Sequence, residues 1–394
     1  ALIPTIGTGL LILCAVPKTY VHKLLSMKFI VGIGLISYSA YLWHQPLLAF
    51  ARHRLLGDVS ELILITLCLT SLAMAWFSWR FVEAPFRNRQ RFGRTSIFRL
   101  SAINILMFST IGLTLHFTNG LERLKTLSYS TEELRIYNLV KLHTDYDLYD
   151  RMHSSDCKLW AKDINDLSIS EFDKCSARFG APLVVLGDSH AMNMFNIFAQ
   201  SKSYDFVVGL SQGYCRAHTQ KVSCHYNSSA DFLREIAPLE PTIVYHQAGS
   251  YFFTDENGSY QPPTNKEVFF DKNNVIKVNS YLNYLSDFGL SVIWLGAFTE
   301  YGINPSLYPT QLKEVPLNSF KVFDQIDLSV RETIEKKGMV SFKYISFNDL
   351  YKITEQVIFD DCLIWRDKDH FSTCGEKHIA QNADWTVLLS HNSK

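Results

Sequence analysis

Two short motifs carry side chains that together could form a nucleophile and its base. Gly187-Asp188-Ser189-His190 contains a serine, and Asp367-Lys368-Asp369-His370 contains a histidine with an acid three residues before it. A serine hydroxyl becomes nucleophilic when a histidine takes its proton and an acid orients that histidine. At this spacing the chain can fold back, so that Asp367 meets one ring nitrogen of His370 and the other faces the serine. The motifs are therefore candidates for nucleophilic catalysis.

Each motif also has a simpler explanation. Asp and Ser are favoured helix N-caps, so the first motif alone could mark only the start of a helix. Asp150-Arg151-Met152-His153 repeats the Asp-x-x-His spacing, and about one such match is expected by chance in a chain with 13 histidines. Position favours His370, because it follows the last expected strand and precedes the last expected helix. His153 lies before the expected sheet begins.

The elements that must position these motifs alternate along the second part of the chain. Short apolar runs without polar alternation predict strands at 182–186, 206–210, 242–246, 292–295 and, more weakly, 340–345. Helix-like stretches lie at 190–200, 228–236, 275–288, 317–336 and 375–389, with another at 131–142. This order predicts a three-layer α/β/α domain with a parallel sheet. Sites in such domains gather at the carboxyl ends of the strands, where Ser189 would lie.

The charge of the chain is divided between two parts of opposite sign. The 394 residues contain 38 Lys+Arg and 38 Asp+Glu, yet residues 1–120 have eleven basic and three acidic residues, a net charge of +8. The remaining residues have 27 basic and 35 acidic residues, a net charge of −8. The balance excludes a nucleic-acid partner, which would require a basic excess, and the 47% hydrophobic content excludes a disordered chain.

The basic part has the composition of a membrane domain. Apolar runs at 29–51, 61–79 and 97–117 are each long enough to cross a bilayer, whereas 1–16 is too short and is interpreted as the end of a helix from a longer chain. Six arginines between Arg80 and Arg99 predict a cytoplasmic loop, which places everything after Gly120 on the far side. We expect a partial membrane domain at 1–120, a linker at 121–180 and a soluble domain at 181–394.

The cysteines agree with export of the second part. Six of the eight follow residue 150, and an even number suits disulfides in an oxidising compartment. No Cys-x-x-Cys spacing occurs, so we favour disulfides over a structural zinc and expect no bound metal. Neighbouring pairs are the simplest of fifteen connectivities: Cys157 with Cys175, Cys215 with Cys224, and Cys362 with Cys374.

The motifs resemble two known families. Gly-Asp-Ser after the first strand, paired with Asp-x-x-His before the last helix, resembles the SGNH (GDSL-like) hydrolase superfamily. Residues 36–46 (ISYSAYLWHQP) and 77–87 (FSWRFVEAPFR) resemble the last helices of bacterial membrane acyltransferase family 3. The two matches cover nearly the whole chain, in the order seen in fused O-acetyltransferases that modify lipopolysaccharide O-antigen and similar surface glycans.

The resemblance implies roles for individual residues. Ser189 is expected to be the nucleophile, His370 the general base and Asp367 its orienting partner. The oxyanion hole is expected to use the N–H groups of Ser189 and Gly213. The third donor is normally an asparagine in a Gly-x-Asn-Asp motif, which is absent here, so Gln247 is the candidate.

Two further histidines need an interpretation. We interpret His190 as a packing or hydrogen-bonding residue rather than a second base. His44 lies near the outer end of an expected membrane helix, where an unpaired histidine is costly, so it is a candidate membrane-site residue. We nevertheless favour a structural role for it.

These features predict an O-acyltransferase of the bacterial inner membrane, most simply an O-acetyltransferase, with its last domain in the periplasm. Its partners would be the lipid bilayer and a cell-surface glycan or lipid-linked precursor. This portion is expected to bind no cofactor, while the complete protein would use acetyl-CoA as acyl donor. Two alternatives remain open: a periplasmic carbohydrate esterase with the same triad, and a glycan-binding module without turnover.

Overall fold

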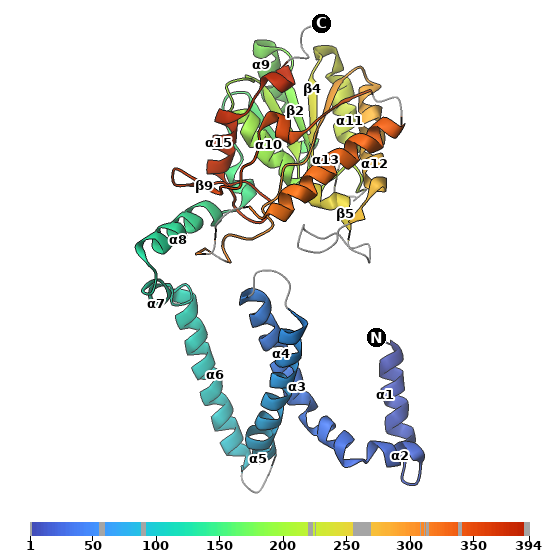
Figure 1. Cartoon of the computed structure of the whole chain (residues 1–394), viewed down its shortest axis with the longest axis vertical. Helices are drawn as coiled ribbons and strands as arrows, with labels where there is room; N and C mark the ends of the chain where they lie inside the picture. Colours follow the sequence, from blue (N-terminus) through green and yellow to red (C-terminus); the bar gives the residue numbers. More distant parts are fainter. Residues whose placement is uncertain are drawn as a thin grey trace. The chain divides into compact units, whose positions relative to one another are not determined.

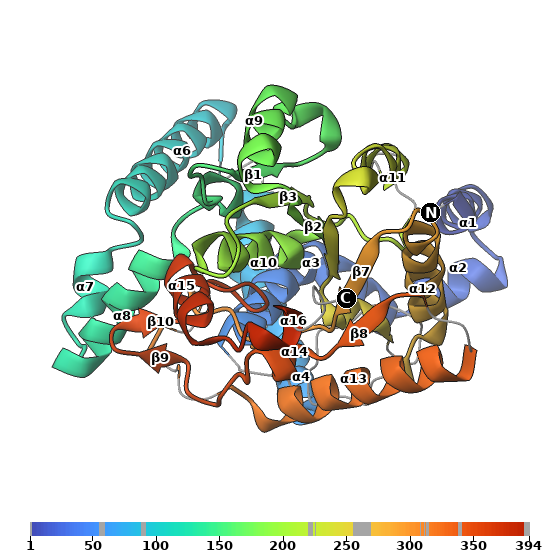
Figure 2. The ribbon, with the colours of Figure 1, turned by 90° about the horizontal axis from the view of Figure 1, so that it is seen from above.

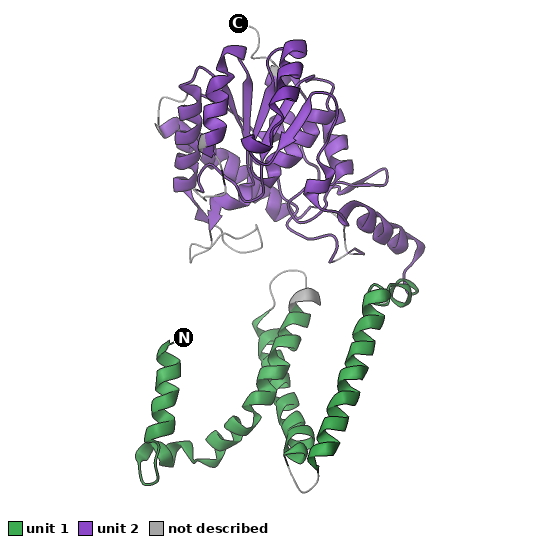
Figure 3. Cartoon of the chain, turned by 180° about the vertical axis from the view of Figure 1, so that it is seen from behind, with its two compact units in different colours: residues 1–127 green, residues 128–394 purple. Residues whose placement is uncertain are grey.

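The computed structural model describes residues 2–54, 60–87, 92–219, 224, 226–254, 269–307, 309–310, 312, 315–337 and 341–389. Two predictions lie partly outside these residues: the loop between Arg80 and Arg99, at 88–91, and the last expected strand, at 340. The chain forms two compact units, residues 1–127 and 128–394 (Figures 1 and 3).

The first unit is helical. Its helices are α1 (Leu2–Cys14), α2 (Tyr20–Leu25), α3 (Lys28–Arg54), α4 (Glu61–Ser78), the π-helical turn η1 (Trp79–Glu83), α5 (Ala84–Phe86), α6 (Arg94–Phe117) and α7 (Glu122–Thr126). Within the described residues, Glu61–Phe86 and Arg94–Phe117 are long and apolar enough to cross a membrane, judged by length and composition. They contain the expected spans 61–79 and 97–117. The expected span 29–51 lies in α3, which is not one of these two helices, because Tyr, His and Gln side chains lower its mean hydropathy.

The second unit is an α/β domain. Its strands are β1 (Lys158–Ala161), β2 (Leu183–Gly187), β3 (Val207–Ser211), β4 (Thr242–His246), β5 (Phe253–Thr254), β6 (Phe269–Phe270), β7 (Ser291–Leu295), β8 (Lys343–Ile345), β9 (Ile358–Phe359) and β10 (Cys362–Leu363). Its α-helices are α8 (Thr131–Thr144), α9 (Ile169–Phe179), α10 (Ser189–Gln200), α11 (Tyr226–Glu235), α12 (Lys272–Ser286), α13 (Leu317–Lys337), α14 (Phe347–Leu350), α15 (Thr373–Asn382) and α16 (Thr386–Leu389). Short 3₁₀ turns complete it: η2 (Leu148–Arg151), η3 (Ile164–Asp166), η4 (Ala237–Leu239) and η5 (Gly249–Phe252).

A parallel sheet forms the centre of this domain, with the strand order β1-β3-β2-β4-β7-β8. The chain passes from β2 to β3 on one side and then to β4 on the other, so the strand order reverses at the carboxyl end of β2. Open α/β sheets bind ligands in the crevice at such a point. Because α10 begins directly after β2, its first residue, Ser189, lies at that edge.

Apolar side chains on the two faces of the sheet form two separate cores. Val185 and Val207 pack on one face beneath α10 and α15, whereas Val184 and Val208 pack on the other beneath α9, α11, α12 and α13. Figure 2 shows α10 and α15 on one side of the strands and α11 and α12 on the other. The sequence lacks polar alternation in these strands because both faces are buried.

Two elements of the sheet domain lie in the segment expected as a linker. β1 pairs in parallel with β3, and Phe172 of α9 is buried in the core beside it. The domain therefore includes residues well before the expected start at 181. The last expected helix, 375–389, is two helices, because the chain leaves the helix at Ala383 before α16 begins.

Three disulfides join the neighbouring cysteine pairs, Cys157–Cys175, Cys215–Cys224 and Cys362–Cys374. This is the pairing expected from the sequence. Cys14 and Cys68 are free. Each disulfide closes a short segment, so it limits the unfolded chain mainly near its own loop.

Removal of the first disulfide is expected to destabilise the sheet domain. Cys157 precedes β1 and Cys175 lies on α9, 18 residues away, so the bond fastens the edge strand to its covering helix. We expect Cys157→Ser combined with Cys175→Ser to lower the free energy of unfolding by about 3 kcal/mol. Urea denaturation followed by tryptophan fluorescence measures this loss. Cys68→Ser, which changes a free cysteine, should have almost no effect, and an equal loss in both variants would contradict the prediction.

Candidate active site

Ser189 begins α10 at the edge of the sheet. Its side chain is half-buried, and the preceding Asp188 caps the helix by accepting a hydrogen bond from the His190 N–H at 3.0 Å. The first N–H groups of an α-helix have no acceptor within the helix and carry a partial positive charge. The location therefore offers a hydroxyl group beside donors that can stabilise an oxyanion.

Asp188 is fully buried and ties together the segments that follow three strands. Besides capping α10 after β2, its carboxylate accepts hydrogen bonds from Arg216 Nε at 2.8 Å and from the Ala248 N–H at 3.2 Å. Arg216 follows β3, and Ala248 follows β4. A buried carboxylate is stable only when it is paired and hydrogen-bonded, as it is here. Asp188 therefore holds the turn that carries Ser189, a role that the sequence did not indicate.

The predicted base and acid lie together. His370 Nδ1 is 2.9 Å from Asp367 Oδ1 and 3.0 Å from Asp367 Oδ2, and the Asp367 carboxylate also accepts from the His370 backbone N–H at 2.8 Å. The other ring nitrogen, Nε2, is buried and has no hydrogen-bond partner among the described residues. The acid thus occupies Nδ1 and leaves Nε2 available to accept a proton.

The charge around His370 favours its protonated form. Burial lowers the pKa of His370, but hydrogen bonds to Asp367 and Asp369, together with their charges, outweigh burial and raise it to about 10. A histidine acts as a general base only when it is neutral. We therefore expect the reactivity of the free enzyme to increase with pH above neutrality.

Asn193 holds the His370 segment against the helix that carries Ser189. Asn193 lies one turn after Ser189 on α10. Asn193 Oδ1 accepts a hydrogen bond from the Phe371 N–H, and Asn193 Nδ2 donates one to the Phe371 carbonyl, both at 3.3 Å. The described residues include no hydrogen bond between the Ser189 hydroxyl and His370. Such bonds often tighten only when substrate binds. The structure brings the predicted triad to one edge of the sheet without closing the serine–histidine contact.

A buried carboxyl group beneath the site completes this clamp. Glu376 of α15 accepts hydrogen bonds from Asn193 Nδ2 at 2.6 Å and from Asn196 Nδ2 at 2.9 Å. Burial raises the pKa of Glu376 to about 8, although the two amides lower it. Asn193 and Asn196 lie three residues apart, so they share one face of α10. In the sequence, only the three-residue spacing of these two asparagines indicates that they act together, and this spacing is too common to identify a site.

Glu376 is expected to make stability depend on pH. Its folded-state pKa of about 8 lies above its ordinary value of 4.5, so the folded state retains a proton that the unfolded state releases between these values. Its stabilising contribution is full below pH 4.5 and is lost as the pH rises through 8. Glu376→Gln cannot ionise and should flatten this decrease. Urea denaturation at several pH values measures the slope, exposed Glu171→Gln is the control, and an unchanged slope would contradict the expectation.

Of the two further oxyanion donors expected from the sequence, one is engaged within the protein and the other is not. The Gly213 N–H donates to the Tyr149 hydroxyl oxygen at 3.0 Å, so an oxyanion could use it only if that hydroxyl moved away. Gln247 is buried, and its Oε1 accepts from the Tyr245 hydroxyl at 2.6 Å, whereas its Nε2, the group that could donate to an oxyanion, has no hydrogen-bond partner among the described residues. Tyr149 was not singled out from the sequence, because its role depends on the packing of η2 beside the loop after β3. Both donors remain predictions.

His190 lies inside the domain beside the site. It is fully buried, and its ring stacks on Phe298 with centroids 4.5 Å apart and planes 2° apart. This contact agrees with a packing role. His44, in the other unit, has Nδ1 2.7 Å from the Tyr41 carbonyl oxygen of its own helix, a local contact that identifies no function.

Ligand atoms of His190, Asp369 and His370 lie within 4.8 Å of one another, close enough to be considered for a metal ion. His370 Nδ1 already faces Asp367, so a metal ion on Nε2 would occupy the nitrogen that must take the serine proton. The absence of a metal therefore remains an expectation.

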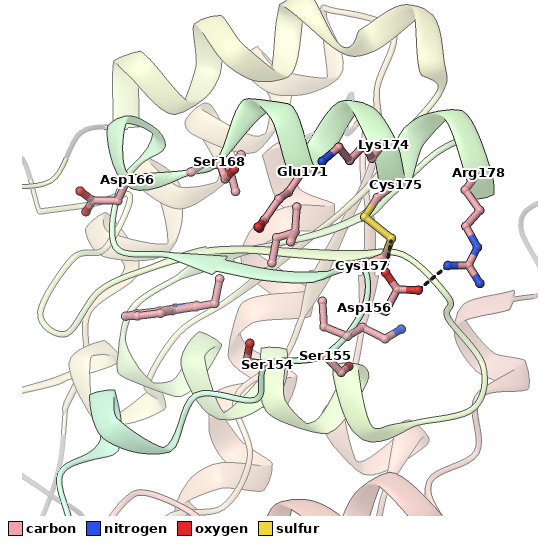
Figure 4. Close-up of a pocket in the computed structure, with 14 residues that line it drawn as sticks. Ser154, Ser155, Asp156, Cys157, Asp166, Ser168, Glu171, Lys174, Cys175 and Arg178 are labelled. Atoms are coloured by element: carbon pink, nitrogen blue, oxygen red, sulfur yellow. Dashed lines mark hydrogen bonds and ion pairs between the residues drawn. A yellow bond between two sulfur atoms is a disulfide. The ribbon is translucent and has the colours of Figure 1, made fainter.

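The hollow in Figure 4 lies away from the sheet edge that carries Ser189. It has a volume of about 460 Å³ and is lined by residues of β1 and α9, with the Cys157–Cys175 disulfide and the Arg178–Asp156 ion pair at its side. Its lining includes none of the predicted catalytic residues. Its charged side chains are of both signs, so its electrostatics favour no particular ligand.

A family model for the SGNH domain that is fused to AT3 domains matches residues 156–383, more than half of the chain. The chain belongs to this SGNH family. The match begins just before β1 and ends after α15, so it covers the sheet, Ser189 and the Asp367–His370 pair. It does not extend to residues 1–120, whose resemblance to acyltransferase family 3 stays a prediction.

Comparison with curated proteins adds a short match to acetyltransferases. The SGNH-family chain is 38% identical over 74 residues to O-acetyltransferase OatA of Staphylococcus aureus, in strains NCTC 8325 / PS 47 and COL. The match spans 18% of this chain and 12% of the length of those relatives. Among solved structures, "Crystal Structure of TesA" is 14% identical, covers 52% of this chain and 97% of its own, and has a TM-score of 0.28, which is too low to support an argument.

Proposed function

We propose that this protein is an O-acyltransferase that transfers an acetyl group to a hydroxyl group of a cell-surface polysaccharide, such as lipopolysaccharide O-antigen. The observation that carries the proposal is the Asp367–His370 pair, whose unpartnered Nε2 lies at the same sheet edge as Ser189. The SGNH family match and the short match to O-acetyltransferases favour acyl transfer as the chemistry.

In the proposed mechanism, His370 Nε2 takes the proton of the Ser189 hydroxyl while Ser189 Oγ attacks the acyl carbonyl carbon. Asp367 orients the imidazole and stabilises the imidazolium ion that forms. The imidazolium protonates the leaving group as the acyl-enzyme forms. A glycan hydroxyl then attacks this ester while His370 takes its proton. His370 returns that proton to Ser189 Oγ as the acyl–serine bond breaks, which releases the acylated glycan and the free serine.

The negative charge of the tetrahedral intermediate would be stabilised at the start of α10. The Ser189 N–H would donate to the oxyanion, and the partial positive charge at the start of the helix would add to its stabilisation. Gly213 would contribute after its bond to Tyr149 opened, whereas Gln247 would donate through its unpartnered Nε2 while its Oε1 still accepts from Tyr245. We propose these two as secondary donors.

The location that we propose is the bacterial inner membrane, with the SGNH domain in the periplasm. The two apolar helices and the three disulfides of the SGNH domain support this placement. Residues 1–120 would then belong to a multi-pass membrane acyltransferase domain. In the complete protein that domain would pass on acetyl groups from acetyl-CoA, and the partner of the SGNH domain would be the glycan or its lipid-linked precursor.

A transferase gives its acetyl group to a sugar, whereas an esterase gives it to water. Measuring which of the two accepts the acetyl group therefore distinguishes these functions. The detergent-solubilised chain would be given 4-nitrophenyl acetate as donor, with and without O-antigen oligosaccharide released from the source bacterium. Transfer predicts acetylated oligosaccharide by mass spectrometry and faster nitrophenol release with the acceptor. Hydrolysis to acetate alone, at a rate that the acceptor does not change, would instead support an esterase.

A further inference from the structure

His370 faces a second carboxylate, that of Asp369, which occupies a variable position of the Asp-x-x-His motif. Asp369 Oδ1 lies 3.2 Å from His370 Nδ1, the same nitrogen that Asp367 Oδ1 approaches at 2.9 Å. A ring nitrogen carries only one hydrogen, so the two carboxylates share or compete for one N–H. Asp369 therefore contacts the proposed base directly.

Asp369 also faces the helix that carries Ser189. Its Oδ2 lies 4.0 Å from Nε2 of the fully buried His190, the residue after Ser189. Neither ring nitrogen of His190 has a hydrogen-bond partner in the described part of the chain, and the ring stacks on Phe298. The His190 and His370 ring centroids are 5.2 Å apart. Asp369 thus lies between the imidazole beside the nucleophile and the imidazole of the base.

The two carboxylates differ in their other partners. Asp367 Oδ2 is 3.1 Å from Arg366 Nη1, so a fixed cation offsets part of its charge. Asp369 has no arginine or lysine partner among the described residues. Burial raises the pKa of Asp369, but its contacts with His190 and His370 outweigh burial and lower it. The titratable and charged groups around His370 are Asp367, Asp369 and Arg366 of its own loop, His190 of α10, Glu376 of α15, and Glu300 after β7.

Glu300 extends this cluster into the domain. It is buried, its Oε1 accepts from the Ser250 N–H at 3.0 Å, and burial raises its pKa to about 7. Its charge interacts with His190 and with Asp369. Glu300 therefore adds a buried acid to the side chains that surround His190 and Asp369.

We propose that Asp369 is a second positioning acid for His370, held in place by His190, and that it acts on the reaction only through that imidazole. The proposal rests on the proposed function of Ser189 and His370. Removal of its negative charge would leave the base oriented by Asp367 but make it easier to deprotonate. The base would then become active at a lower pH.

The pH dependence of Ser189 labelling tests this role. The full chain in detergent would react with a fluorophosphonate probe from about pH 6 to about pH 11, and the second-order rate constant would be measured at each pH. Asp369→Asn should move the midpoint of the rise to lower pH by roughly 1 to 3 units, the range typical of losing one adjacent charge. Asp231→Asn, an exposed acid on α11, is the matched control. A lower rate at every pH with an unchanged midpoint would overturn the proposal.

Direct titration of His370 gives the same answer even if Ser189 does not react. The NMR spectrum of ¹³C-histidine-labelled protein would be recorded as a function of pH. The His370 signal is the one that is missing from the spectrum of His370→Gln, and its titration midpoint should lie at a lower pH in Asp369→Asn. An unchanged midpoint would overturn the role of Asp369. Failure of Ser189 to label, together with a shifted midpoint, would instead overturn only the proposed function.

Asp369 should also partly replace Asp367 when Asp367 is removed. With Asp367→Asn alone, Asp369 can still accept from Nδ1, so we expect labelling to decrease only about tenfold. Combined with Asp369→Asn, the decrease should reach at least about 1,000-fold, the level of His370→Ala. A double variant no slower than Asp367→Asn would contradict the role of Asp369.

Discussion

Replacement of Ser189 with alanine is expected to reduce acetyl transfer by at least about 1,000-fold, because it removes the atom that forms the acyl-enzyme. The fold should be retained. Ser189 is half-buried and begins α10, whereas the cap of that helix is Asp188, so alanine removes no capping hydrogen bond. Alanine is also well accepted in a helix.

The measurement is the steady-state release of nitrophenol from 4-nitrophenyl acetate by the detergent-solubilised chain, with the thermal unfolding of each variant recorded. Ser203→Ala is the matched control, because Ser203 follows the same helix and lies outside the proposed triad. It should keep full activity. If Ser189→Ala retained more than about a tenth of the wild-type rate, Ser189 would not be the nucleophile.

Replacement of Gly187 with alanine should give the largest loss of stability. Gly187 lies at the end of β2 with φ at +147°, a conformation that L side chains rarely adopt. A Cβ there would lie 1.8 Å from the His246 carbonyl oxygen and 2.9 Å from Ala191 Cβ. The first contact is with backbone, so β2 and β4 would have to separate at their carboxyl ends. We expect a loss of about 4 kcal/mol or more in the free energy of unfolding.

Urea denaturation of Gly187→Ala and of Gly180→Ala distinguishes two causes of lost stability, the steric clash of the new Cβ and the strained backbone conformation. Gly180 also has a positive φ, +78°, but a Cβ there would meet nothing within 4 Å. Gly180→Ala should therefore cost only about 1 to 2 kcal/mol. Equal losses in the two variants would mean that the contact with His246 is not the cause.

The sequence predicted most of the sheet well, because strands buried on both faces leave a clear apolar pattern. The edge strand β8, in which Lys343 is exposed, left a weaker one. All five expected strands are present as β2, β3, β4, β7 and β8. β1 was missed because Lys158–Ala161 is a four-residue edge strand that begins with a charged residue. The helix α9 was missed for a related reason, since only Phe172 and Cys175 on its inner face are buried.

The site was predictable only where its residues are close in sequence. Asp367 and His370 share one turn, so their contact follows from spacing. The Asn193 clamp on Phe371 joins residues 178 positions apart and depends on the packing of α10 against α15. The sequence predicted no more for Asp188 than a helix cap, and it indicated no separate role for Asp369. Their partners Arg216 and His190 become evident when the strands are placed side by side.

The most direct test of the account is the detection of an acetyl group on Ser189. The chain would be mixed with 4-nitrophenyl acetate, quenched in acid within the first turnover, digested and analysed by tandem mass spectrometry. The account predicts one acetyl group on Ser189, absent from Ser189→Ala and lost faster when an acceptor oligosaccharide is added before the quench. Turnover without acetylation of Ser189, or with the acetyl group on another residue, would contradict it.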